Sequence, residues 1–172
     1  MDKLLGGDLR SIGKADEVIA EILEEPALFY EVFKGIKSSN PLIRMRAADV
    51  VEKIAREHPE YLIPCKEELL HEVSEIEQQE VRWHVALLFS YLDLTDTEKS
   101  IVVDKLLAWA NNSKSKIVRV NSLQALADIG RKDSRYRELA IKTLEQAMAG
   151  GSPAVVARAK KLLKQLNKKK LS

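Results

Sequence analysis

The sequence predicts an all-α protein, and within that class an α-solenoid, in which antiparallel helix pairs follow one another along the chain. Three observations predict this class: one segment recurs four times, its apolar residues have helical spacing, and chain-breaking residues separate the segments. The 172 residues include only 7 glycines and 5 prolines, too few for a loop-rich β protein. No stretch alternates cleanly between apolar and polar residues as a half-buried strand would.

The recurring segment starts with an apolar residue, which is followed by arginine in the first three copies. The copies begin at Ile43, Val81, Val118 and Val155, so that they are 38, 37 and 37 residues apart. Apolar or small residues recur at positions 0, 4, 7, 8 and 11 from each start. At about 100° per residue, these positions form one stripe along a helix. The pattern therefore predicts four equivalent helices, each of which buries one side.

Capping residues agree with these helices. Asn40-Pro41 and Ser152-Pro153 each place a capping side chain before a proline at the first helical position, and Ser115 precedes the third copy. Gly130 follows the third stripe, where a glycine commonly ends a helix.

Other helical segments fill the intervals between the copies. We expect helices at 15–24, 26–37, 60–77 (with Pro64 inside its first turns), 95–110 and 134–149. Pairing them with the four copies gives four to five antiparallel helix pairs in a single domain, 1–172. Its parts are a cap in 1–24, repeats at about 26–57, 60–93, 95–130 and 134–167, and a basic tail at 168–172.

The third copy also resembles a known family. Its residues 118–130, Val-Arg-Val-Asn-Ser-Leu-Gln-Ala-Leu-Ala-Asp-Ile-Gly, are similar to the second helix of a HEAT repeat. The resemblance extends over about 26–167, and the whole chain resembles small, single-domain HEAT-like repeat proteins of archaea. Two departures stand out, because Val156 replaces the expected arginine and only the third copy has the closing glycine. The resemblance implies a scaffold that binds other proteins, and it implies fold better than function.

Composition limits the class of protein further. Apolar residues make up 45% of the chain and charged residues 31%, as in globular proteins. No apolar run approaches the roughly 18 residues of a membrane span, and the N-terminus lacks the layout of a signal peptide, so we expect a cytoplasmic protein. Cys65 is the one cysteine, which excludes an intramolecular disulfide and a metal site made of cysteines alone.

The sequence contains no recognisable catalytic constellation. It has no glycine-rich phosphate loop and no nucleophile motif. Cys65 follows Pro64 near a helix start, which can lower a thiol pKa, but no His or Asn motif accompanies it, and we expect an inert thiol. The histidines are His58, His71 and His84. His71-Glu72 resembles the His-Glu pairs of iron-binding HEAT-repeat hydroxylases, which carry several such pairs where this chain has one. We therefore expect a non-enzyme without a cofactor, and a metal-dependent enzyme centred on His71-Glu72 is the last alternative.

A binding surface is predicted on the helices of the recurring segment. Position 2 of each copy, at 200°, points away from the buried stripe, and it is apolar in every copy. We call this side the second-helix face and expect it to bind a protein or peptide, unless the same residues are packed inside the molecule. Arginines at position 1 border it, and they either bond turn carbonyls or face a ligand. The residues of this face are Met45, Trp83, Leu87 and Val120, with Arg44, Arg82 and Arg119 at its margin.

Charge is strongly segregated along the chain. Residues 1–80 have a net charge of −8, and residues 81–172 have a net charge of +10. This predicts weak, salt-sensitive, head-to-tail self-association. The basic half also suggests an alternative function, nucleic-acid binding, which DNA-binding alkylpurine glycosylases with HEAT-like arrays also perform. The basic patch would consist of Arg158, Lys160, Lys161, Lys164 and Lys168.

Overall fold

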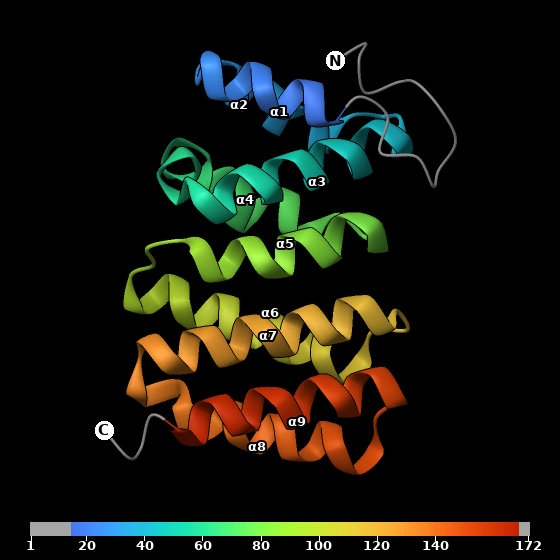
Figure 1. Ribbon diagram of the computed structural model, residues 1–172, viewed down its shortest axis with the longest axis vertical. Helices are drawn as coiled ribbons and strands as arrows, with labels where there is room; N and C mark the ends of the chain where they lie inside the picture. The colour runs from blue at the N-terminus through green and yellow to red at the C-terminus, as the bar shows by residue number, and fades with distance from the viewer. Residues whose placement is uncertain (1–14, 169–172) are drawn as a thin grey trace. The chain divides into compact units, whose positions relative to one another are not determined.

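The computed structural model describes residues 15–168 of the chain (Figure 1). Every regular element in this range is helical, which confirms the all-α class. The chain divides into two compact units, Met1–Leu92 and Asp93–Ser172, which we describe separately; the single domain over 1–172 stays a prediction. Between residues 15 and 168, no helix is both long and apolar enough to cross a membrane. The expected cap before Ala15 and the tail after Lys168 lie outside the described residues.

The first unit is organised around α3, which carries the first copy of the recurring segment. This helix packs against α1, α2 and α5, and α5 carries the second copy. Phe33, Ile36 and Ile22 are completely buried beside it, so the core lies between α3 and its neighbours. The α-helices of the unit are α1 (Ala15–Glu24), α2 (Leu28–Lys34), α3 (Pro41–Glu57), α4 (Lys66–His71) and α5 (Gln79–Tyr91).

The single helix expected at 60–77 is wrong. The segment consists of a 3₁₀ helix at Pro59–Cys65, the short α4, and a 3₁₀ turn at Val73–Glu75. Pro64 has no N–H to donate to an α-helical hydrogen bond, and its ring clashes with the carbonyl of the preceding turn. The chain therefore takes the tighter 3₁₀ form until the proline is passed.

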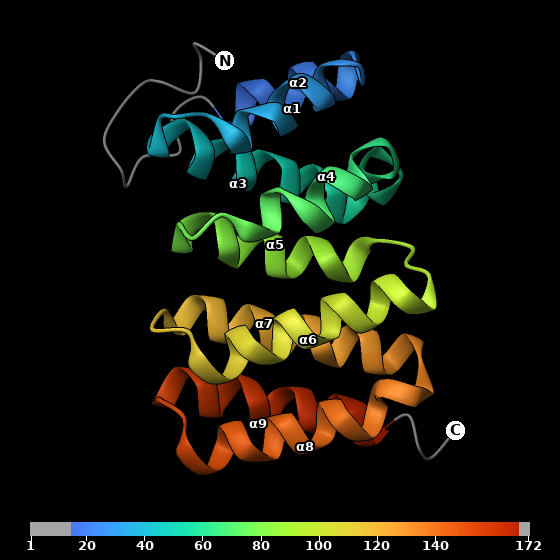
Figure 2. The same ribbon diagram turned by 180° about the vertical axis from the view of Figure 1, so that it is seen from behind.

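The second unit consists of two helix pairs. α6 (Asp96–Asn112) pairs with α7 (Lys116–Lys132), and α8 (Arg137–Gly150) pairs with α9 (Pro153–Lys168). α7 and α9, which carry the third and fourth copies, form one layer in Figure 1. Figure 2, from behind, shows α6 and α8 in front of them as the other layer.

The predicted stripe is buried in all four helices. Seventeen of its 20 side chains are buried, including Val50 and Val85, and the other three, Ile43, Leu92 and Leu163, are half-buried. The spacing of apolar residues therefore indicated the correct side of each helix. We refer to α3, α5, α7 and α9 as the recurring helices.

Two of the three predicted caps are confirmed. The Asn40 side chain accepts a hydrogen bond from the Leu42 N–H at 2.9 Å, and the Ser115 hydroxyl accepts one from the Val118 N–H at 3.4 Å. Ser152 differs, because only its main-chain carbonyl bonds α9, to the Val156 N–H at 2.9 Å. Its hydroxyl is buried and has no hydrogen-bond partner within the described part of the chain.

Gly130 does not end the third helix, which continues to Lys132. The glycine serves close packing instead. A Cβ at this position would lie 3.1 Å from the Ala140 Cβ and 3.2 Å from the Arg137 Cα. A side chain would thus push the start of α8 away, and glycine allows α7 and α8 to approach.

The stability of each unit should depend on the buried stripe. Leu88 on α5 is fully buried, and Leu126 on α7 is 2% exposed. Replacing either with alanine should lower the free energy of unfolding by about 2–5 kcal/mol, because it leaves a cavity. The free energy is measured by urea denaturation. Leu23→Ala, at a leucine that is 50% exposed, is the control and should cost less than about 1 kcal/mol. Equal costs at all three positions would contradict the assigned core.

Candidate functional site

The arginines at the margin of the second-helix face bond the backbone. Arg44 donates from Nε to the Gln78 side chain at 2.7 Å. Its Nη1 donates to the carbonyls of Ser38 and Ser39 at 2.8 and 3.1 Å. The guanidinium therefore ties the turn before α3 to the turn before α5.

Arg82 and Arg119 follow the same rule. Arg82 Nε donates to the Ile76 carbonyl at 3.0 Å, and Arg119 Nε donates to the Ala110 carbonyl, near the end of α6, at 2.8 Å. Each arginine thus bonds a carbonyl that precedes its own helix. This agrees with the first of the two predicted alternatives, in which the arginines bond turn carbonyls and do not face a ligand. Such carbonyls at helix ends and turns otherwise lack a partner. A direct ligand contact would compete with these bonds.

The apolar residues of the second-helix face are divided between the two units. Met45 on α3 and Trp83 and Leu87 on α5 belong to the first unit, and all three are half-buried. Val120 on α7 belongs to the second unit and is also half-buried. These side chains are therefore partly accessible to solvent and partly packed against the rest of their unit.

The first unit contains a buried carboxylate, Glu52 on α3. The Glu52 side chain is only 3% exposed. It accepts hydrogen bonds from Arg56 Nη2 at 2.8 and 2.9 Å and from the Tyr91 hydroxyl at 2.8 Å. Burial, together with the bond to Glu52, raises the pKa of Tyr91 to about 12. The charge is thus paired and bonded, as a buried carboxylate requires.

His84 lies between this carboxylate and a second one. Its Nδ1 is 4.0 Å from Glu52 Oε2, and its Nε2 is 4.0 Å from Asp49 Oδ1. Lys53 Nζ is 2.8 Å from Asp49, so both carboxylates have a closer cation. Burial lowers the pKa of His84, and the flanking carboxylates oppose that shift only in part. The Trp83 ring stands edge-on to the imidazole, with 5.9 Å between ring centroids.

This polar cluster is not among the predicted sites, although the register of the copies contains an indication of it. His84 is three residues after the start of its copy, and Asp49 is six residues after the start of the preceding one. In the second unit, the same positions hold Arg158 and Gln124, which are bonded at 2.9 Å. Polar side chains at positions 3 and 6 therefore meet between neighbouring recurring helices in both units.

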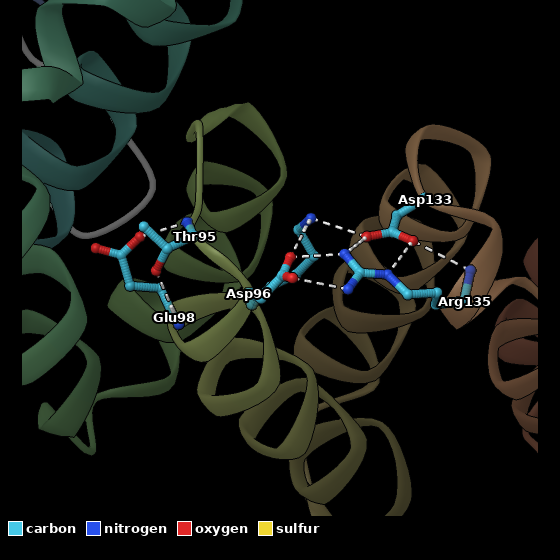
Figure 3. Close-up of polar contacts among 6 residues, drawn as sticks. Thr95, Asp96, Glu98, Asp133 and Arg135 are labelled. Carbon is cyan, nitrogen blue, oxygen red and sulfur yellow. Dashed lines mark hydrogen bonds and ion pairs between the residues drawn. The ribbon is translucent and has the colours of Figure 1, made fainter.

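A second polar network, in the second unit, joins the turn before α8 to the start of α6 (Figure 3). Arg135 donates to the two carboxylate oxygens of Asp96 at 2.6 and 2.8 Å and to Asp133 at 2.7 Å. Lys99 Nζ lies 2.9 Å from Asp133. Hydrogen bonds from Arg135 are the main reason why the pKa values of Asp96 and Asp133 are lowered. Thr95 and Glu98 beside them form a reciprocal cap on α6.

The basic patch lies on α9. Lys160, Lys161 and Lys164 are exposed, and none of them forms an ion pair with another residue of the described chain. Arg158 instead donates to Gln124, inside the unit. Lys168 ends the helix, and its side chain lies outside the described part.

The candidate residues for metal or thiol chemistry are His71, Glu72 and Cys65. The first two form ion pairs with other residues, and the third is buried. Glu72 pairs with Lys37 at 3.0 Å, and His71 Nε2 lies 3.5 Å from Glu67. Among residues 15–167, no group of three or more ligating side chains could hold a metal ion. Cys65 is buried, and burial raises the pKa of its thiol to about 12, which leaves little reactive thiolate near neutral pH.

No protein-family model, curated protein or solved structure significantly matches this chain.

His84 should titrate below the ordinary histidine pKa of about 6.5, because its surroundings disfavour the imidazolium. The contribution of the neutral His84 ring to the free energy of unfolding should therefore be fully present above about pH 6.5. It should decrease as the ring is protonated at lower pH. NMR of a variant with His58→Gln and His71→Gln leaves a single imidazole to follow. A measured pKa above 6.5 would show that Asp49 and Glu52 outweigh burial.

Arg135→Gln should lower the thermal midpoint at neutral pH, because Asp96 and Asp133 lose their main hydrogen-bond donor. The lowered carboxyl pKa values mean that this contribution is present above about pH 4 and disappears as the carboxylates are protonated. The parent and the variant should therefore converge on acidification. Lys142→Gln, at an exposed lysine on α8, is the control for loss of one positive charge. A parent-variant difference that is as large at pH 2 as at pH 7 would contradict the assignment.

Proposed function

We propose that this chain is a non-enzymatic scaffold, an α-solenoid of HEAT-like helix pairs, that binds a protein or peptide with its second-helix face. The observation that carries the proposal is the partial exposure of Met45, Trp83 and Leu87 on α3 and α5. Large apolar side chains on a side that faces away from the core are characteristic of interfaces, and tryptophan and methionine are enriched there.

The repeated register supports the solenoid part of the proposal. Within each unit, two recurring helices bury the same stripe and meet through positions 3 and 6. Helix pairs that pack on their neighbours in a constant register are the building principle of α-solenoids.

The buried polar cluster supports the binding part. Glu52 on α3 accepts from Tyr91 on α5, so that a charged hydrogen bond joins the two helices that carry Met45 and Trp83. A surface held in this way loses little conformational entropy when a partner binds. The arginines contribute by positioning the helices, since Arg44, Arg82 and Arg119 bond carbonyls of their own unit. We therefore assign the contact with the partner to the apolar residues.

Trp83→Ala should remove peptide binding without unfolding the chain. Peptides selected from a random displayed library against the immobilised parent should bind the variant at least about 30-fold more weakly, the loss expected of a tryptophan hot spot. Affinity is measured by fluorescence polarisation, and folding by thermal denaturation. Tyr30→Ala, at a 39%-exposed aromatic residue on α2, is the control and should bind as the parent does.

Two results would contradict the proposal. Selected peptides could bind Trp83→Ala as tightly as the parent, which would place their contact elsewhere. Alternatively, the substitution could lower the free energy of unfolding by about 3–5 kcal/mol, the cost of removing a fully packed tryptophan.

A further inference from the structure

One side of α9 is covered less than the corresponding sides of the other recurring helices. Positions 1, 5, 8 and 12 of a copy lie within 80–140° and share one side of the helix. In α3 and α7 the side chains at positions 5 and 8 are at most 2% exposed: Ala48, Val51, Leu123 and Leu126. In α9, Val156 and Leu163 are half-buried, and Lys160 and Asn167 are exposed. We call these four residues of α9 the open edge.

The open edge combines two apolar side chains with one lysine and one asparagine. Val156 and Leu163 are seven residues apart, two turns along the same line. Lys160 lies between them, at a position where α3 has alanine and α7 has leucine. α9 contains no acidic residue, so its lysines are not neutralised within the helix. A partner for this edge must offer apolar surface together with negative charge.

α1 has the complementary character. It contains acidic residues but no basic residue. Leu23 is 50% exposed, and Asp16, Ala20 and Glu24 are exposed on the same helix. The surface beside it is hollowed by a depression that Glu21, Glu24, Glu25 and Leu28 line. α1 therefore presents a leucine surrounded by carboxylates.

The charges of the two units are complementary in the same sense. Met1–Leu92 contains 18 acidic and 11 basic residues, a net charge of −7. Asp93–Ser172 contains 8 acidic and 17 basic residues, a net charge of +9. The first unit of one molecule should therefore attract the second unit of another, most strongly at low salt.

We propose that the open edge of α9 docks on α1 of a second copy of this chain. Val156 and Leu163 then contact Leu23, and the lysines of α9 approach Asp16 and Glu24 of the other copy. The contact is heterologous, because different surfaces of the two molecules meet. In such a pair, the copy that uses its open edge still has its α1 available, and the other copy still has its open edge available. Further copies can therefore add in the same way. The proposal does not depend on the second-helix face.

A polyanion is the competing occupant of these lysines, and the structure favours a second copy. Neither α7 nor α9 contains an aromatic residue on which the bases of a single strand could stack. Phosphates alone would also leave Val156 and Leu163 without an apolar contact.

A charge-swap experiment tests the proposal. One variant carries Lys160→Glu and Lys164→Glu on α9, and the other carries Asp16→Lys and Glu24→Lys on α1. Sedimentation velocity should show concentration-dependent oligomers of the parent at about 20 mM salt and monomers at about 300 mM. Each variant alone should be monomeric at both salt concentrations, and an equimolar mixture should associate again, because its reversed surfaces are complementary.

A matched control separates local contact from net charge. Lys114→Glu with Lys142→Glu makes the same change in charge at exposed lysines outside α9 and should leave association at low salt unchanged. Circular dichroism establishes that every variant is folded.

Three results would overturn the proposal: a monomeric parent at 20 mM salt, association that survives the α9 reversal, or a mixture of the two reversed variants that stays monomeric. If the monomeric parent also binds a 20-base-pair duplex with steep salt dependence, and the α9 reversal removes that binding, the lysines serve a polyanion instead.

Discussion

The burial of one apolar stripe on each recurring helix is the constraint on which the rest of this structure depends. Because the stripe repeats at positions 0, 4, 7, 8 and 11, it sets the rotation of each helix about its axis, and it thereby sets what every other position faces. Position 1 then meets the end of the preceding segment, where Arg44, Arg82 and Arg119 find carbonyls. Positions 3 and 6 meet between neighbouring helices, where polar pairs form.

The polar groups in these networks join helices and turns to one another. Glu52, Arg56 and Tyr91 satisfy one another around a buried carboxylate, whose isolated burial would be costly. In the second network, Arg135 and Asp96 are exposed, so water weakens their ion pair, and its role is to position a turn. Both networks hold helices in place.

Partial exposure, rather than chemistry, distinguishes the candidate binding surfaces. Met45, Trp83 and Leu87 are on α3 and α5, which the hydrogen bond between Glu52 and Tyr91 joins, and helices held in this way suit the proposed recognition of another chain. The open edge of α9 differs, because Lys160, which has no ion-pair partner in the described chain, lies between its two apolar residues. The two surfaces would therefore respond differently to salt: apolar contact is insensitive to it, whereas charge attraction weakens.

The sequence by itself determined the helical class, the four recurring helices and their buried sides, because helical periodicity is a local property of side-chain order. It also identified Asn40 and Ser115 as caps, whose hydrogen bonds span only two or three residues. Only the tertiary structure decided that Gly130 is a point of close contact with α8, that the Ser152 hydroxyl leaves its helix uncapped, and that Glu52 meets Tyr91. The break in 60–77 is the exception, because it follows from Pro64 and is therefore a local effect. Contacts between residues 10 to 39 positions apart depend on how helices pack, and the pattern along one helix does not by itself determine which atoms of another helix will face it.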